Sequence, residues 1–220
     1  MKNSVFLNKQ KICVMKKIIL GALIAFGISS NLSAQKKGDV EFGVNIGFNS
    51  SSVSDSEYSY DSSTGLNVGG SLDYYFSSVW SLKVKMIYDQ KGWDNDVILN
   101  LDDGEYYPTD YNLDYLTVPI MANWHFGNHR EWYLNFGPYF GFLLSAKDTQ
   151  FDADVKKFFN TNDFGLVAGI GVKVPISNKL KFFAELEGQG GFTDINKESG
   201  YSSLTNSRTS INVGLNFLLK

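Results

Sequence analysis

Apolar and polar residues alternate along eight stretches of the chain. In each stretch every second residue is apolar, which is the period of a β-strand with one apolar face. None of these apolar faces carries a charge. The pattern predicts eight strands, at Val40–Phe48, Leu66–Phe76, Trp80–Tyr88, Leu116–Trp124, Trp132–Phe142, Phe164–Val174, Leu180–Phe192 and Thr209–Leu219.

The opposite faces carry charged and amide side chains, and they decide the kind of β-protein. A soluble barrel would turn its apolar faces inward, but the interior of an eight-stranded barrel is small. It is too small for the many bulky Phe and Trp residues in these stretches. We therefore predict an all-β, eight-stranded antiparallel transmembrane β-barrel of the outer-membrane type, with apolar residues facing lipid and polar residues facing the lumen.

The connections between the predicted strands alternate in length. The short ones are Ser77–Val79, Gly127–Glu131 and Ser177–Lys179; the long, polar ones are Asn49–Gly65, Asp89–Tyr115, Ser145–Asp163 and Thr193–Asn206. Outer-membrane barrels have short periplasmic turns and longer external loops. The sequence thus predicts an integral protein of the cell outer membrane, with both termini in the periplasm and four loops outside.

Aromatic residues gather near the ends of the predicted strands. One group lies beside the short turns and a second lies near the long loops. Aromatic girdles of this kind mark the two membrane interfaces of barrels. The predicted girdle at the short turns comprises Phe76, Trp80, Trp124, Phe126 and Trp132, and the second contains Tyr88, Phe142, Phe164 and Phe192.

The last predicted strand ends one residue before the C-terminus. Its pattern of Asn212, Gly214, Phe217 and Leu219 resembles the C-terminal insertion signal of bacterial outer-membrane barrels. This resemblance implies that the barrel-assembly machinery is a partner during insertion.

The N-terminal residues have the features of a cleaved signal peptide. Lys16 and Lys17 precede an apolar run of about 11 residues, too short for a membrane helix, which needs roughly 20. A short small or polar segment ends at Ala34. We expect a signal peptide over residues 1–34, with Met15 as an alternative start, then a short lead over 35–39 and the barrel domain over 40–220.

Removal of this signal peptide changes the chemistry available to the chain. Cys13 is the only cysteine and leaves with it, which excludes disulfides and thiolate chemistry from the mature protein. Five lysines leave as well, so 15 basic residues remain against 23 acidic ones. The resulting net charge of about −8 argues against nucleic acid as a partner.

Three motifs resemble a known family. They are the stretches at 115–126 (YLTVPIMANWHF), 137–146 (GPYFGFLLSA) and 163–171 (DFGLVAGIG). The first two are similar to the central hairpin, and the third to the next strand, of the PorT-like outer membrane protein beta-barrel domain family, often labelled porin family. The resemblance extends from about Gly38 to the C-terminus and implies an eight-stranded outer-membrane barrel, without implying a pore. Pro119 and Pro138 lie in these motifs, and we predict a local bulge there because proline removes a ladder donor.

The charges on the predicted lumen face nearly balance. An eight-stranded barrel has an interior just wide enough for side chains to fill, so paired charges would plug it, with inward glycines leaving room for longer neighbours. The alternative is a narrow path for ions or a binding cavity. The predicted lumen network consists of Glu41, Asp73, Lys83, Lys85, Asp89, Lys173, Lys181, Glu185, Glu187 and Arg208.

Other chemistry has weaker support in the sequence. Lipid-modifying barrel enzymes use a histidine near the outer rim, whereas His125 and His129 lie beside a predicted periplasmic turn. The external loops are acidic and rich in tyrosine, so they could bind a divalent cation or a partner, although no EF-hand spacing occurs. Solvated loops are the simpler interpretation. We predict no catalytic, cofactor or metal site.

The sequence therefore favours a small monomeric outer-membrane barrel that is not an enzyme. Its leading function is structural or interactive, through external loops that meet lipopolysaccharide, an extracellular protein or a secretion system. A narrow porin-like channel is the alternative function, and an outer-leaflet lipid enzyme is a third.

Overall fold

The computed structural model describes residues 35–55, 60–100, 102–197 and 203–219. The expected signal peptide and its alternative start at Met15 lie outside these residues. The part described forms a single compact unit.

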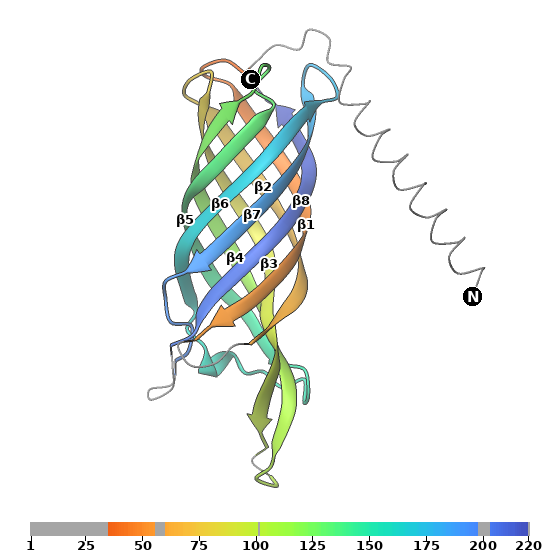
Figure 1. The fold of residues 1–220 in the computed structure, drawn as a ribbon, viewed down its shortest axis with the longest axis vertical. Coiled ribbons are helices and arrows are strands. Elements are labelled where there is room, and N and C mark those ends of the chain that lie inside the picture. Colours follow the sequence, from red (N-terminus) through yellow and green to blue (C-terminus); the bar gives the residue numbers. More distant parts are fainter. Residues whose placement is uncertain (1–34, 56–59, 101, 198–202, 220) are drawn as a thin grey trace, which may run out of the picture. The chain divides into compact units, whose positions relative to one another are not determined.

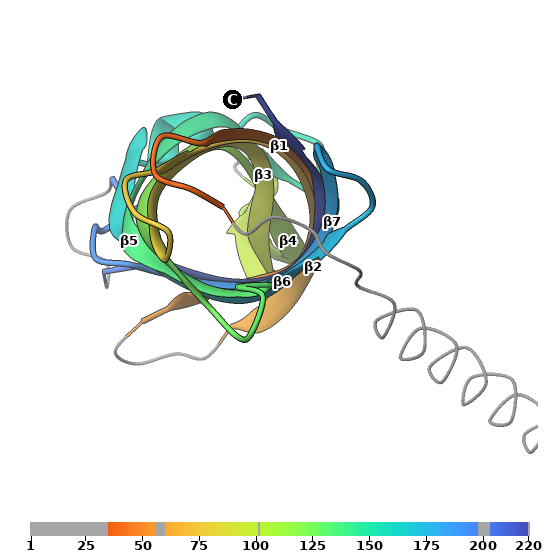
Figure 2. The same ribbon diagram turned by 90° about the horizontal axis from the view of Figure 1, so that it is seen from above.

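Eight antiparallel strands close into one barrel in sequence order, as predicted (Figures 1 and 2). The ring closes where the first strand pairs with the last, from Glu41 opposite Leu218 to Ser54 opposite Thr205. The strands are β1 (Val40–Ser54), β2 (Asp61–Tyr75), β3 (Trp80–Leu99), β4 (Tyr106–Phe126), β5 (Trp132–Asp148), β6 (Asn162–Pro175), β7 (Leu180–Gly191) and β8 (Thr205–Leu218).

Side chains alternate between lipid-facing and lumen-facing positions along every strand. On β3, for example, the outward Leu82, Met86 and Tyr88 are exposed, while the inward Lys83 and Lys85 are buried. An apolar outer surface and a polar interior are what a barrel in lipid requires. The period-two pattern of the sequence is therefore explained by the two faces of one closed sheet.

The strands continue beyond the lipid-facing belt at the end that carries the long connections, so the predicted long loops are too long. The largest difference is at 89–115, where β3 runs on to Leu99 and β4 begins at Tyr106. Above the belt the polarity is reversed: Trp93 and Leu113 point inward and are buried. The prediction ended these strands early because it looked for apolar residues on the outward face. An outward face has to be apolar only where it contacts lipid.

The segment between β5 and β6 contains a short 3₁₀ helix, η1 (Lys156–Phe158). A single bridge joins Phe159, just after η1, to Asn196 in the segment between β7 and β8. Two of the long connections are thus tied together. Among the described residues, no helix has the length and apolar character needed to cross a membrane.

The bulge predicted at Pro119 and Pro138 is wrong. Pro119 lies opposite Tyr139 and Ala122 opposite Phe136, which is one continuous register with an unpaired gap between. A proline deletes a hydrogen bond from the ladder but does not require an extra residue, so the pairing is interrupted and resumes in the same register. The shift between β4 and β5 falls elsewhere, between Asp114 and Tyr115.

Candidate functional site

The lumen holds a network of paired charges contributed by six of the eight strands, with Lys91 of β3 and Asp163 of β6 nearest the long-loop end. Equal numbers of acidic and basic side chains take part, each in an ion pair. All are buried except Lys181, whose side chain is 13% exposed. Burying a charge is costly unless it is paired and hydrogen-bonded, and here every charge is paired. The members are Glu41, Asp73, Lys83, Lys85, Asp89, Lys91, Asp163, Lys173, Lys181, Glu185, Glu187 and Arg208.

Lys173 is the centre of the group nearest the short turns. Its ammonium lies 2.7 Å from Glu41 and 3.0 Å from Asp73, and it donates to the Tyr75 hydroxyl at 2.9 Å. Lys181 also pairs with Glu41, so that carboxylate has two cationic partners. Asp73 depends mainly on Lys173 and on a hydrogen bond of 3.0 Å from Asn123.

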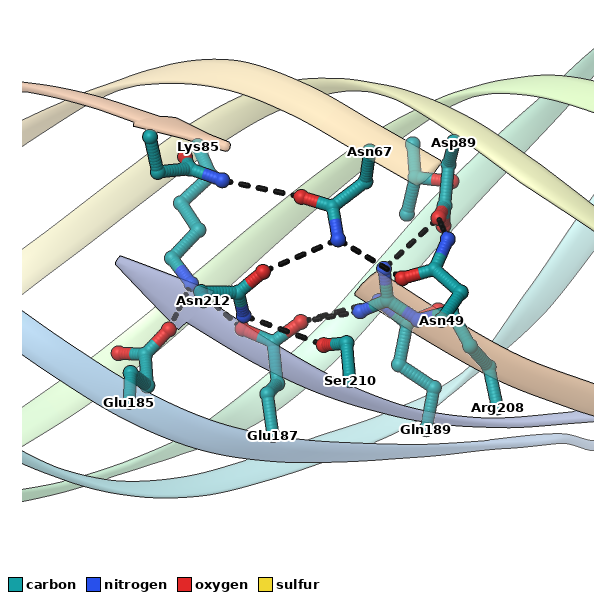
Figure 3. Close-up of polar contacts among 12 residues, drawn as sticks. Asn49, Asn67, Lys85, Asp89, Glu185, Glu187, Gln189, Arg208, Ser210 and Asn212 are labelled. Atoms are coloured by element: carbon teal, nitrogen blue, oxygen red, sulfur yellow. Dashed lines mark hydrogen bonds and ion pairs between the residues drawn. The ribbon is translucent and has the colours of Figure 1, made fainter. Parts of the chain in front are cut away.

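A second group occupies the middle of the lumen (Figure 3). Lys85 reaches across the barrel from β3 and pairs with both Glu185 and Glu187 of β7. Glu187 in turn pairs with Arg208 of β8, whose guanidinium also lies 2.7 Å from Asp89 of β3. These bonds connect opposite walls of the barrel, so the space between the walls is filled by side chains.

Asparagine side chains link the two walls beside this group. Asn67 accepts a hydrogen bond from Asn45 at 3.0 Å and donates to Asn49 at 2.7 Å and to Asn212 at 3.0 Å. Asn49 then donates to Asp89 at 2.8 Å, which joins the amides to the charges (Figure 3). The amides and the middle group of charges thus form one connected network rather than isolated pairs, and such networks are mutually strengthened in a low dielectric.

Inward glycines make room for the larger members of this interior, as predicted. A Cβ at Gly171 would overlap the ring and hydroxyl of Tyr133, and one at Gly47 would overlap the amides of Asn212 and Asn67. At these two points the interior is therefore packed so closely that it has no room for a side chain larger than that of glycine.

One ion pair was missed by the sequence prediction. Lys91 lies 3.3 Å from Asp163, with its ammonium 4.9 Å from the ring centres of both Tyr115 and Tyr139. Asp163 also accepts hydrogen bonds from Tyr139 and Asn206. The available signal was the alternation itself: Lys91 follows Asp89 at the same period of two, but it was assigned to a loop.

Above the charges, an apolar cap fills the mouth of the barrel at its long-loop end. The cap combines inward residues of the strands with residues of the two connections that η1 and its bridge tie together. Trp93 is 1% exposed, and its ring centre lies 4.9 Å from that of Tyr111 and 5.8 Å from that of Phe159. The cap is Val53, Trp93, Leu113, Tyr115, Leu143, Ala146, Val155, Phe159, Ile195 and Leu204.

Tyr111 lies at the edge of the apolar cap and stays neutral at neutral pH. Burial, reinforced by the nearby carboxylates of Asp96 and Asp148, raises the pKa of Tyr111 to about 12. Asp148 is itself buried and accepts backbone hydrogen bonds from Phe151 and Ala153. This carboxylate at the end of β5 therefore shapes the turn that follows the strand.

The residues of the C-terminal pattern lie on both faces of β8. Asn212 points into the lumen and belongs to the amide network, and Gly214 leaves room for the ring of Phe183. Phe217 and Leu219 are exposed on the outer face. The structure shows what each of these residues contributes to the barrel, whereas the role of the pattern in membrane insertion stays a prediction.

The aromatic residues predicted as a girdle lie together on the outer surface beside the short turns. Trp80 stands opposite Trp124, and Phe126 opposite Trp132. The ring centres of Trp124 and Phe126 are 5.0 Å apart. Phe76, directly after β2, is likewise exposed. This cluster, which spans the neighbouring strands β2 to β5, has the position expected of one part of an interface girdle.

The surroundings of the two histidines and of the acidic residues do not favour catalysis or metal binding. His125 is buried inside the short-turn end, 2.9 Å from Ser81, whereas His129 is exposed on a turn. In the described part of the chain, no three His, Cys, Asp or Glu residues converge as metal ligands. The acidic loop residue Glu57 lies outside the described residues.

Comparison with known proteins agrees with this architecture. A family model described as "Outer membrane protein beta-barrel domain" matches residues 33–197. The outer membrane protein OprG of Pseudomonas aeruginosa is 11% identical over 86% of this chain and 99% of its own, with a TM-score of 0.52. The outer membrane protein AlkL is 11% identical over 87% and 95%, with a TM-score of 0.50. At such identities the likeness shows the fold alone. A comparison with curated protein sequences finds no match.

The family model and the barrel lead to the same assignment. The matched region covers most of the chain, and its lipid-facing belt and polar lumen are those of a membrane barrel. The narrower PorT-like resemblance stays a prediction. The protein belongs to the outer membrane protein beta-barrel domain family and is an integral protein of the outer membrane.

Proposed function

We propose that this protein is a plugged outer-membrane barrel that acts through its external surface and conducts no solute. The single observation that carries the proposal is the filled, charge-balanced lumen beneath the apolar cap. A permeating ion would have to break pairs such as Arg208–Asp89, whose partners are both buried. Breaking a buried pair typically costs about 3 to 5 kcal/mol, which opposes an open path.

The proposal includes an orientation. Because barrels of this class place short turns in the periplasm and long loops outside, the apolar cap and the β3–β4 hairpin face the external medium. External partners, which include lipopolysaccharide and proteins of the cell surface or a secretion system, would meet this end. We also propose that the protein is a monomer, with the barrel-assembly machinery as its partner only during insertion.

A narrow channel is the second candidate, because some buried polar atoms of the lumen lack a partner. Within the described residues, these include Oδ1 of Asp73, Asn123 and Asn135 and the hydroxyl of Tyr133, all in the half near the short turns. Buried polar groups are normally hydrogen-bonded, so this half favours hydration. It would supply at most a partial path, since the central charges and the apolar cap lie above it.

A lipid-modifying enzyme is the least supported candidate. An enzyme acting on the outer leaflet needs an accessible catalytic group near the external rim. His125 is buried at the opposite end, and its neighbour Ser81 is buried too. We therefore propose that the protein is not an enzyme.

Single-channel conductance of the refolded chain from residue 35 onward tests this proposal in a planar bilayer. We expect silence from samples whose mobility shifts on heating in detergent gels, which shows a folded barrel. As a positive control, replacing Lys85 and Glu185 by serine together with the cap residue Trp93 by glycine empties part of the lumen and of the apolar cap without changing the net charge, and should produce openings. Discrete openings in the parent protein, with a selectivity that changes on substitution of Lys83 or Lys85, would instead establish the channel.

A further inference from the structure

The hairpin made by the ends of β3 and β4 projects beyond the rest of the barrel (Figure 1). Its cross-strand pairs include Val97 with Pro108 and Leu99 with Tyr106. β2 pairs with β3 only as far as Asp94, and the pairing of β5 with β4 begins only at Tyr111. In the described part of the chain, the tip of this hairpin is therefore a two-stranded ribbon without neighbouring strands.

The two faces of the ribbon differ in what covers them. On one face, Ile98 packs against the apolar cap and the ring of Tyr107 lies 5.5 Å from that of Phe151. The other face is bare: Val97 is 55% exposed, Leu99 42% and Tyr106 68%. With the exposed Pro108, these residues form a continuous apolar patch, which we call the hairpin face. An isolated two-stranded ribbon is only marginally stable in water and gains from a third strand.

Lipid is out of reach of the hairpin face. The apolar outward run of β3 ends at Tyr88, and Val97 follows nine residues later in the sequence, roughly 30 Å along the strand. The outward positions between them include Gln90 and Asp94, which are polar. The hairpin face therefore lies in the aqueous medium outside the membrane, where an uncovered apolar patch marks an interaction site.

Among the described residues, no strand covers the edge of β3 beside the hairpin face. The Asn100 amide donates to the carbonyl of Glu105 at 2.9 Å. In an antiparallel pair such bonds fall at every second residue, so residues 98 and 100 bond to β4 and the amides of Val97 and Leu99 point away from β4. The Val97 amide is bonded to Asp96, but that of Leu99 has no partner among the described residues. On the β4 edge, Pro108 has no N–H and Thr149 bonds to Asp110, so only the Tyr106 amide at the tip points outward.

Charge determines which occupant fits. Six acidic residues and no basic one lie between residues 92 and 111 of the sequence: Asp94, Asp96, Asp102, Asp103, Glu105 and Asp110. A second copy of the chain would bring the same negative charge to this edge and be repelled. A basic partner would be attracted, because opposite charges steer association.

We propose that the open edge of β3 and the hairpin face together form a docking site for an extended protein segment that alternates apolar with lysine or arginine residues and adds to β3 as a further strand. Backbone bonds to the edge would give affinity, and alternate side chains would cover the hairpin face. The inference rests on the proposed function, in that it names the kind of partner the external surface would take.

A direct test uses defined peptides and the folded protein in a non-ionic detergent. The probe is a fluorescent ten-residue peptide that alternates lysine with valine, and fluorescence anisotropy measures its binding. We expect saturable binding that weakens at least tenfold when salt rises from 50 to 500 mM. A peptide with glutamate in place of lysine should not bind, and one with N-methylated valines should bind at least tenfold more weakly.

Two variants of the protein separate strand addition from nonspecific attraction. Leu99→Pro removes the open edge donor but spares the hairpin ladder, because Leu99 and Tyr106 form a non-hydrogen-bonded pair; we expect at least tenfold weaker binding. Phe158→Ser removes an exposed apolar residue elsewhere at the same end and should leave affinity unchanged. Equal binding by all three proteins, equal binding of the glutamate peptide, or no binding of the lysine peptide would overturn the proposal. Self-association through Leu99, detected by cross-linking, would overturn it in favour of a second copy.

The outcome is independent of the conductance experiment. Hairpin variants leave the lumen untouched, so a barrel that conducts yet binds the peptide would refute the plugged barrel alone. A silent barrel that binds no peptide would refute the docking site alone.

Discussion

Replacing Lys173 by methionine should destabilise the barrel more than any single substitution at its rim. Lys173 is the cation that balances Asp73, and both groups are buried. Methionine keeps the apolar stem but leaves this carboxylate without a cation at bonding distance. Leaving a buried charge unpaired costs about 3 to 5 kcal/mol. At a slope of about 2 kcal/mol per molar, the urea midpoint should fall by roughly 1.5 to 2.5 M.

Urea titration of the protein in lipid vesicles, followed by tryptophan fluorescence, measures this loss. Lys181→Met is the matched control: Lys181 sits at the rim, and its partner Glu41 keeps Lys173, so we expect a loss within about 1 kcal/mol. Adding Asp73→Asn to Lys173→Met removes the stranded charge and should recover about 2 kcal/mol or more. A loss below 1 kcal/mol for Lys173→Met, or a double variant no more stable than the single one, would refute the argument that pairing stabilises the lumen.

Two further predictions concern packing. Gly171→Ala should cost about 1 to 3 kcal/mol in the same titration, because its Cβ overlaps Tyr133. The double variant with Tyr133→Ala should lose less stability than the sum of the two single losses, and additive losses would contradict the steric explanation. Gly188→Ala is the neutral control, because a Cβ at Gly188 meets open space. Trp93→Ala should cost about 3 to 5 kcal/mol, since this ring is the largest buried side chain of the apolar cap, and limited proteolysis should then cut the connection that contains η1. Phe158→Ala is its exposed control, and an uncut connection would contradict the assigned role of the cap.

The face of each lumen residue was predictable from the sequence, but its partner was not. Alternation places Lys173 and Asp73 on inward faces because the period of a strand is two. Their ion pair joins residues 100 positions apart in the sequence. Which inward residues share a level of the barrel depends on the stagger between strands, and no local pattern carries that information.

The ends of the strands were predicted less well, for a related reason. The sequence criterion was an apolar outward face, which lipid imposes only across the belt. Lys91 and Trp93 continue the inward face of β3 beyond it, so the Lys91–Asp163 pair and the apolar cap were assigned to loops. The bridge between Phe159 and Asn196 joins two irregular segments and leaves no periodic signal at all.

The reversal of polarity along β3 connects these observations. Within the belt Met86 faces outward and Lys85 inward, whereas beyond it Trp93 is buried inside and the outward positions are polar. The outward residues of each half thus match the surrounding medium, which is hydrocarbon within the belt and water beyond it at the long-loop end. Val97 and Leu99 break this rule, because they are outward, apolar and beyond the reach of lipid. An apolar surface in water is best explained by something that covers it, and this makes the hairpin, rather than the filled lumen, the part of the molecule where a partner should be sought.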